Sequence, residues 1–267
     1  MAVLPEGTPC WADAMFADLE GAKAFYGDVL GWTFGESSSE YGNYTQAYSD
    51  GKAVAAIVPP MPNQEGEAVS AWCLYLASPD AAGTAEKIRG NGGEVLMGPM
   101  AVGEFGSMVI AKDPAGVVFG VWQAGTHEGF EKQGAPGAYT WAEVITRDGA
   151  AADGFFPAVF PYAVKRMDSG QVDYKIFHVR EQPVLGRMQA GPKDLPPEAP
   201  NYVSVYFAVD DCDATIARIT ERGGKLYFGP MDSPFGRFAA VGDQQGAAFG
   251  VIDLGKTSGD VPGLVAE

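Results

Sequence analysis

The sequence predicts an α+β protein made of two tandem copies of one domain, each with two βαβββ submodules that form a curved mixed sheet around a cleft. Three observations support this prediction. An internal repeat covers nearly the whole chain, the order of β-prone and helical segments recurs within each copy, and the length of 267 residues suits two cores of ordinary size. Hydrophobic residues make up 46% of the chain, which is enough to build both cores.

The internal repeat is clearest in the second half of each copy. The segment Trp72–Ala77 recurs as Val203–Ala208 at an offset of 131 residues, and Gly98–Met100 recurs as Gly229–Met231 at the same offset. One deletion later the offset becomes 130, and the matches continue in order. Such an ordered series of matches indicates a duplication.

The N-terminal parts of the two copies also correspond at an offset of 130, with Trp11 matching Trp141. Between the copies lies a polar, glycine-rich stretch without a sustained apolar period. We therefore expect a first domain over residues 1–125, a linker over 126–136 and a second domain over 137–267.

The first submodule predicts a strand, a helix and a hairpin. Residues 10–15 can alternate faces as a strand. Asp18 suits a helix N-cap, and an apolar stripe at helical spacing predicts a helix over about 19–30. Two β-prone runs flank Asp50-Gly51, a dipeptide that favours the tight turn of a hairpin.

The second submodule repeats this plan. We expect a strand at 72–77, then a helix that begins at Ser78 as its N-cap and runs to about Asn91. Hairpin strands should follow near 107–112 and 117–122. A sheet of this size curls, and its concave face is the natural place for a ligand.

Composition limits the classes of partner. The formal net charge is −16, and no basic tract is present that could displace counterions from a nucleic acid. No apolar run is long enough to span a membrane, and the first residues do not resemble a secretory signal, so we expect a cytoplasmic protein. Cys10, Cys73 and Cys212 lack a CxxC spacing, which argues against disulfides and structural zinc. We expect a small-molecule ligand and a monomer or homodimer.

The motifs resemble those of the vicinal-oxygen-chelate superfamily, which includes glyoxalases, bleomycin-resistance proteins and dioxygenases. The matching positions in the first copy are Asp18, Phe25-Tyr26, Leu30-Gly31-Trp32, Tyr75-Leu76-Ala77, Ile88, Gly92-Gly93 and Gly98-Pro99. The resemblance spans both copies and is greatest to the two-domain glyoxalase-like proteins of actinobacteria, often labelled hydroxylases. It implies a cleft on the concave face of each sheet.

The resemblance also implies where a divalent metal would bind, through His, Gln or Glu at set positions. The positions that correspond here are Trp11 and Trp141, Cys73 and Ser204, Gly120 and Gly250, and the hairpin ends near Ala55 and Leu185. An indole offers only an N–H donor, and the set as a whole lacks converging ligands. We therefore expect no metal and no other cofactor, with a new metal site around Asp13 or Glu143 as the alternative.

Three residues are candidates for acid-base catalysis. Asp13 and Glu143 each lie two residues after a tryptophan on the same strand face, where partly apolar surroundings would raise the pKa of a carboxyl. Their alternative role is to accept hydrogen bonds within the sheet. His178 corresponds to Tyr48 in the first copy, and it is either a base in the second cleft or a packed strand histidine.

Aromatic and small polar residues should line the clefts, although core packing will claim some of them. The expected ligand-binding residues are Trp11, Tyr48, Trp72, Cys73, Trp141, Tyr174, Ser204 and Tyr206, with Tyr44 and Phe238 as further aromatic wall residues.

The function that we expect is metal-independent binding of a small, partly aromatic metabolite or antibiotic, as in the resistance branch of the superfamily and in secondary metabolism. One alternative is a lyase, an isomerase or an oxygenase-type tailoring enzyme of natural products that uses the three acid-base candidates. The other is a metal-dependent glyoxalase.

Overall fold

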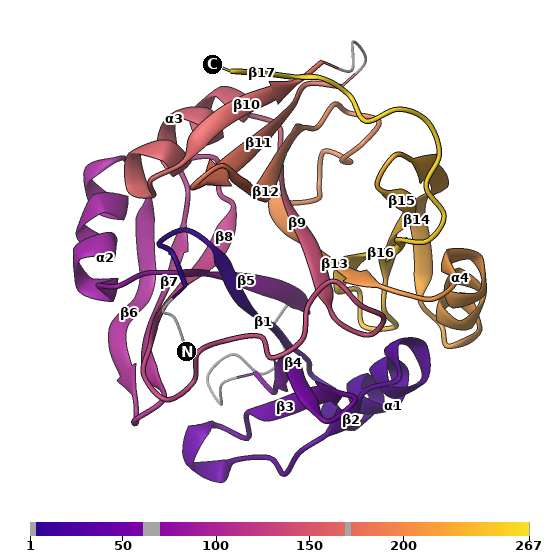
Figure 1. Ribbon diagram of the computed structural model, residues 1–267. Coiled ribbons are helices and arrows are strands. Elements are labelled where there is room, and N and C mark those ends of the chain that lie inside the picture. Colours follow the sequence, from indigo (N-terminus) through magenta and orange to yellow (C-terminus); the bar gives the residue numbers. More distant parts are fainter. Residues whose placement is uncertain (1–3, 61–69, 169–171, 267) are drawn as a thin grey trace.

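The computed structural model describes residues 4–60, 70–168 and 172–266, and it confirms an α+β fold with two curved mixed sheets (Figure 1). The last strand of the first sheet ends at Ala124, and the first strand of the second sheet begins at Tyr139. None of the helices in the described ranges has the length and apolar character that a bilayer crossing needs.

The first sheet has eight strands, and the first strands of its two submodules lie side by side at its centre. From edge to edge the strands are β2 (Thr33–Phe34), β3 (Thr45–Ser49), β4 (Lys52–Val58), β1 (Pro9–Met15), β5 (Ala71–Ala77), β8 (Val118–Ala124), β7 (Gly106–Lys112) and β6 (Glu94–Val102). Because β1 pairs antiparallel with β5, the two submodules pair within one domain rather than across domains.

The second sheet repeats this arrangement and adds one strand from the C-terminal tail. From edge to edge its strands are β14 (Lys225–Ser233), β15 (Gly236–Gly242), β16 (Ala248–Asp253), β13 (Tyr202–Ala208), β9 (Tyr139–Thr146), β12 (Gln182–Gln189), β11 (Tyr174–Val179), β10 (Ala163–Met167) and β17 (Leu264–Ala266). The tail follows the outer rim of the domain before β17 pairs with β10 (Figure 1).

An aspartate caps each of the four α-helices, which are α1 (Leu19–Leu30), α2 (Ala81–Gly90), α3 (Gly149–Val159) and α4 (Cys212–Glu221); a short 3-10 helix covers Ser39–Tyr41. The predicted cap at Asp18 is confirmed. The predicted cap at Ser78 is wrong, since Asp80 accepts the hydrogen bond from the Gly83 N–H. The Ser78 hydroxyl, three residues before the helix starts, instead accepts from the Asp80 N–H.

The two domains share one hydrophobic core, which contains residues of both sheets and of α1, α2, α3 and α4. At its centre the rings of Trp72 and Phe207 lie 5.1 Å apart, and those of Tyr26 and Phe249 lie 5.6 Å apart. Helix α1 contacts α4, and α2 contacts α3, on opposite sides of this core (Figure 1). Because side chains alternate along a strand, the other face of each sheet points away from the shared core.

Candidate functional site

Four side chains form a hydrogen-bonded cluster on the outward, concave face of the second sheet. The Tyr174 hydroxyl on β11 donates to Glu143 Oε1 at 2.7 Å, and the Tyr206 hydroxyl on β13 donates to Glu143 Oε2 at 2.9 Å. Trp141 Nε1 donates to the Tyr174 oxygen at 3.0 Å. Burial raises the pKa of the Glu143 carboxyl, and the tyrosine and tryptophan donors oppose that rise. The carboxyl is therefore held in place and buried, although Glu143 as a whole residue is partly exposed on the concave face.

The same cluster occurs at the equivalent positions of the first domain. Trp11 Nε1 donates to the Tyr44 hydroxyl at 2.7 Å, and the hydroxyls of Tyr44 and Tyr75 donate to Asp13 Oδ2 at 3.2 Å and 3.0 Å. Burial raises the pKa of Asp13 from 3.8 to about 6 despite these two donors. The duplication has thus kept a tryptophan, a carboxyl and two tyrosines as one unit.

Strand alternation brings most of the predicted residues together. Cys73 lies directly opposite Asp13, and Ser204 lies directly opposite Glu143, each on the concave side. Sequence reasoning did not identify Tyr75 as a site residue. Its match with Tyr206 in the repeat was the signal that could have identified it.

Trp72 does not line a cleft, contrary to the expectation. It follows Ala71 on β5 and pairs with Ala14, so its side chain points to the opposite face from that of Cys73. There its Nε1 donates to the Tyr26 hydroxyl at 3.0 Å, and its ring packs in the core that the domains share.

The two predicted hairpin positions also face this core. Ala55 and Leu185 belong to the shared core, whereas Ala56 and Gly186 pair with Asp13 and Glu143. A Cβ at Gly186 would collide with the Tyr174 hydroxyl, so this glycine makes room for the tyrosine.

His178 stands apart from the cluster. The side chain is 3% exposed, and its Nδ1 lies 3.1 Å from the Ile176 carbonyl oxygen. It corresponds to Tyr48, because Tyr48 pairs with Thr33 as His178 pairs with Ala163. The Tyr48 hydroxyl donates to Gln46 Oε1 at 2.7 Å. No hydrogen bond within the described ranges joins either residue to a cluster carboxyl.

The residues present do not fit the divalent metal that the superfamily implies. Gly250 pairs with Tyr206, and a Cβ at Gly250 would collide with the Tyr206 ring; Gly120 and Tyr75 show the same relation. The tyrosine ring therefore fills the place where a ligand glutamate would begin. Across residues 4–60, 70–168 and 172–266, no three His, Cys, Asp or Glu side chains gather as a metal site requires.

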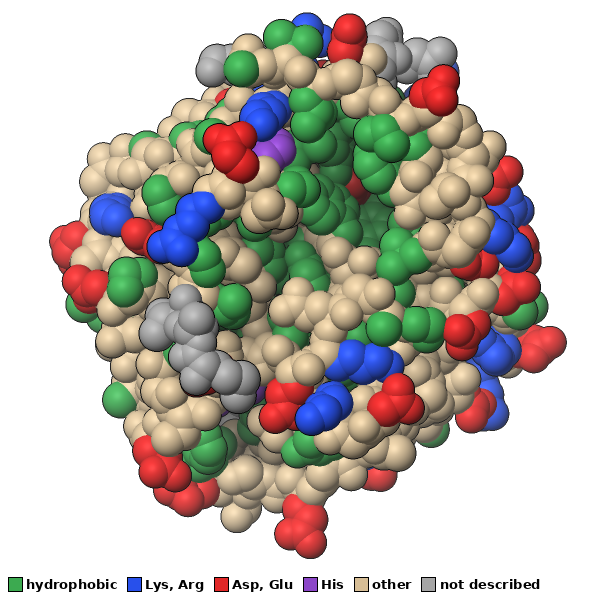
Figure 2. Space-filling view, in the orientation of Figure 1, with side chains coloured by type: hydrophobic (Ala, Val, Ile, Leu, Met, Phe, Trp, Pro, Cys, Tyr) green, Lys and Arg blue, Asp and Glu red, His purple; other side chains and the backbone are tan. Residues whose placement is uncertain are grey.

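The concave faces differ in how far they are covered. In the first domain the linker runs across the face, where the Phe130 N–H donates to the Cys10 carbonyl at 2.8 Å. The rings of His127 and Phe130 lie 4.5 Å and 5.5 Å from that of Trp11, which is only 3% exposed. Trp141 is partly exposed. Figure 2 shows a hollow over the concave face of the second sheet, lined mainly by hydrophobic side chains.

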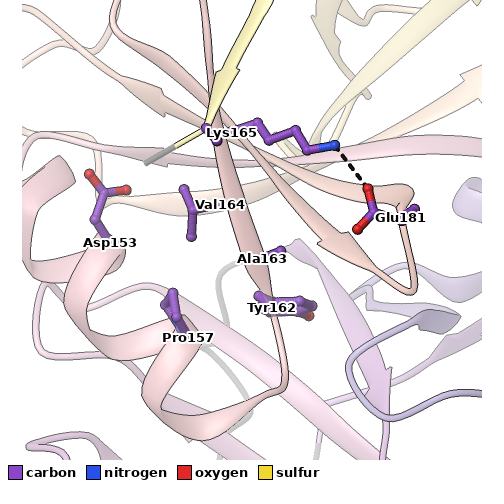
Figure 3. A pocket seen from close by; sticks show the side chains of 8 residues that line it. Asp153, Pro157, Tyr162, Ala163, Val164, Lys165 and Glu181 are labelled. Carbon is purple, nitrogen blue, oxygen red and sulfur yellow. Dashed lines mark hydrogen bonds and ion pairs between the residues drawn. The ribbon is translucent and has the colours of Figure 1, made fainter.

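A separate groove of about 510 Å³ lies between α3 and β10, outside both concave faces (Figure 3). An ion pair between Lys165 and Glu181 at 3.2 Å borders it. The other carboxylate that lines the groove, Asp153, already binds the guanidinium of the fully buried Arg187. The groove thus lacks a carboxyl that is available to a ligand in its interior, and we place the candidate site in the second concave face.

Known proteins resemble the chain over most of its length. The model of the Glyoxalase/Bleomycin resistance protein/Dioxygenase superfamily matches residues 11–121. Anthracycline biosynthesis protein DnrV from Streptomyces peucetius is 36% identical over 260 residues, which cover 93% of this chain and 94% of DnrV. CFP32 from Mycobacterium tuberculosis (strain CDC 1551 / Oshkosh) is 35% identical, covering 92% of this chain and 95% of CFP32.

The fold also matches solved structures. The 2,3-dioxygenase LapB from Pseudomonas sp. KL28 has a TM-score of 0.64 and 13% sequence identity, and the match covers 98% of this chain and 96% of LapB. At this identity the likeness concerns the arrangement of the two domains and their sheets.

Proposed function

Because the chain belongs to the glyoxalase/bleomycin resistance protein/dioxygenase superfamily, we propose that it binds a small, partly aromatic metabolite or antibiotic in the hollow of the second domain, without a divalent metal. The observation that carries this proposal is the pairing of Tyr206 with Gly250. The Tyr206 ring takes the space of a metal ligand, and its hydroxyl fixes Glu143, which becomes the polar anchor for a ligand.

The chemistry of the hollow suits a ligand that is apolar over most of its surface. Phe238 and Tyr206 form part of its wall, with ring centroids 6.4 Å apart, and Trp141 adds an indole. Aromatic side chains attract flat rings through both buried area and ring geometry. The relative DnrV is named for anthracycline biosynthesis, and anthracyclines contain a flat aromatic ring system. This relationship favours an aromatic natural product.

Titration with an anthracycline tests the proposal. Wild-type protein should bind it with a measurable rise in melting temperature, because a ligand that binds only the folded state stabilises that state. Trp141→Phe should retain most of the affinity and Trp141→Ala should abolish it. Replacing Trp141 by Ala can cost about 3 to 5 kcal/mol of stability if its ring supports the fold, so unliganded melting curves accompany each titration. The proposal fails if aromatic ligands leave the wild-type melting temperature unchanged.

Acid-base catalysis is the second candidate, and the position of Glu143 favours it. Its raised pKa and two tyrosine donors are suitable for a base that takes a proton from a bound phenol or enol. Glu143→Gln keeps the shape of the side chain and removes its charge. If the protein is an enzyme, this variant should keep binding and lose turnover. Equal turnover in both proteins would exclude Glu143 as the base.

A further inference from the structure

We propose that Leu195 is a specificity-determining residue of the hollow in the second domain (the second hollow). It closes this hollow just beyond Glu143, so a ligand must carry its hydrogen-bond donor at the end that enters first. This inference rests on the proposed function and deepens it by defining where the polar group of the ligand lies. The linker covers the equivalent face of the first domain (the first hollow) at Trp11, so ligand selection concerns the second hollow.

A small apolar cluster lies on the concave face next to Glu143. Side chains alternate along β9, so Ile145 faces the same side as Glu143. The cluster consists of Ile145, Ala190 and Leu195, with Met188, Ala199 and Tyr202 packed against it. Met188 and Tyr202 are the neighbours of Ile145 on the two adjacent strands, β12 and β13. Two residues along a strand span about 7 Å, so the cluster begins directly beyond Glu143.

Leu195 reaches this cluster from the segment that connects β12 to β13. Among residues 191–200 it alone is buried, with 4% of its surface exposed. Its N–H donates to the Gly191 carbonyl at 3.1 Å, and the Gly191 N–H donates to Asp194 Oδ2 at 2.8 Å. These bonds turn the segment so that Leu195 points inward while its neighbours face solvent. The segment therefore places one apolar side chain against the concave face.

The side chain of Arg147 anchors this segment. Its Nη2 donates to the Ala199 carbonyl at 2.8 Å and also to the Pro196 carbonyl, and its Nη1 donates to Asn201 Oδ1 at 3.2 Å. Asn201 Nδ2 donates in turn to the Ala115 carbonyl of the first domain at 2.7 Å. Because the guanidinium is planar and has several donors, it fixes these acceptors together. Leu195 is thus a fixed wall of the second hollow.

The closed end determines how a ligand can lie. Each Glu143 oxygen accepts one tyrosine hydroxyl, and a carboxylate oxygen can accept a second donor. Along β9, Ile145 and the Leu195 that packs on it lie to one side of Glu143, and the partly exposed Trp141 lies to the other. A ligand whose donor reaches Glu143 therefore extends towards Trp141. Bulk next to the donor collides with Leu195, because overpacking an apolar wall is costly.

Two isomeric phenols test this arrangement. In 4-tert-butylphenol the bulk lies opposite the hydroxyl, and in 2-tert-butylphenol it lies beside the hydroxyl. Calorimetry on the wild-type protein should give a Kd at least tenfold lower for the 4-isomer. Leu195→Ala should lower the Kd of the 2-isomer at least fivefold and leave that of the 4-isomer within twofold.

The matched control is Leu226→Ala, which should leave both Kd values unchanged. Leu226 on β14 pairs with Val241, which packs in the shared core, so Leu226 lies on the face opposite the hollow. If Leu195→Ala does not fold, Leu195→Val replaces it and should still lower the Kd of the 2-isomer at least twofold.

Three results would overturn the role of Leu195 and leave the proposed function intact. These are equal affinity of the wild type for both isomers, an unchanged ratio of the two Kd values in the folded Leu195 variant, and binding of an anthracycline without binding of 4-tert-butylphenol. Weaker binding of the 4-isomer to Leu195→Ala would show that Leu195 supports the hollow without selecting ligands, and would also overturn it. Failure of the proposed function itself, and of this inference with it, would appear as no binding of an anthracycline or of either phenol.

Discussion

At the scale of single residues, the buried carboxyls of the two clusters couple the fold to pH. The Asp13 carboxyl binds its proton more tightly in the folded chain than in the unfolded chain, because burial raises its pKa from 3.8 to about 6. Its ionisation therefore weakens the fold. The resulting loss of folding free energy is absent below about pH 4, grows between about pH 4 and pH 6, and is complete above that range.

Replacing Asp13 by Asn should remove this dependence. A shift of about two pKa units corresponds to about 3 kcal/mol at most, so Asp13→Asn should be more stable than wild type at pH 7 by up to that amount. The difference should vanish near pH 4, as measured by urea unfolding across the range. Asp260→Asn, a change at an exposed position in the tail, serves as the control. A constant difference at all pH values would contradict this account.

A second residue-scale prediction comes from a hydrogen bond that only one copy makes. The Tyr26 hydroxyl donates to Asp243 Oδ2 at 2.9 Å across the domain interface. The equivalent pair is Phe156 and Asp113, and Asp113 Oδ2 is buried without a partner. Phe156→Tyr should supply the missing donor and raise the free energy of unfolding by about 1 kcal/mol.

A double-mutant cycle checks this gain. In an Asp113→Ala background, Phe156→Tyr should no longer stabilise the protein. In the wild-type background, Tyr26→Phe should destabilise the protein, because it deprives Asp243 and Trp72 of their hydrogen-bond partner. Destabilisation by Phe156→Tyr in the wild-type background would show that the two copies are not equivalent at this position.

At the scale of elements, the tail strand β17 protects an edge of the second sheet. It pairs with β10 through Lys165, Arg166 and Met167, while Leu264 and Val265 remain 44% and 45% exposed. Little apolar area is buried, so β17 contributes more by covering the unpaired backbone of β10 than by packing.

Truncation after Ser258 should therefore change association more than stability. The melting temperature should fall by only a few degrees, and light scattering should detect self-association at higher protein concentration, because β10 becomes an exposed edge. A truncated chain that keeps the wild-type mass at every concentration would show that β10 needs no cover.

The elements also show how far sequence reasoning reached. The repeat predicted α1 to α4, because an apolar stripe like that of α1 is a local signal, as are the glycines that follow α1, α2 and α4. It missed β17, a short strand with exposed side chains that has no periodicity of its own. It misplaced Trp72 because a difference of one residue reverses the face of a strand. The contact of His127 and Phe130 with Trp11 joins residues more than a hundred positions apart, for which no local pattern exists.

At the scale of the whole molecule, the donor chemistry of both clusters bears on metal content. Protein purified without chelator should carry well under one equivalent of Zn, Ni, Mn or Fe per domain, as measured by plasma emission. The reason is that each cluster offers one carboxyl whose hydrogen-bond partners are tyrosines. Stoichiometric metal whose removal by a chelator also removes activity would instead support a metal-dependent glyoxalase.

The two halves should also differ in ligand binding. Trp11 is covered by the linker and Trp141 is partly exposed, and His178 has Tyr48 as its counterpart. Titration should show one tight site per chain, or two sites of distinct affinity. Two sites with the same affinity would mean that the linker leaves the first hollow when ligand arrives.

The hydrogen bond from Tyr26 to Asp243 and the contact of Trp72 with Phe207 cross between halves that share one interior. In an assembly of two identical chains, any substitution in one chain would also be present in the other. Joining the halves in one polypeptide removes that constraint. The linker can then cover Trp11 in one half while Trp141 in the other half stays partly exposed.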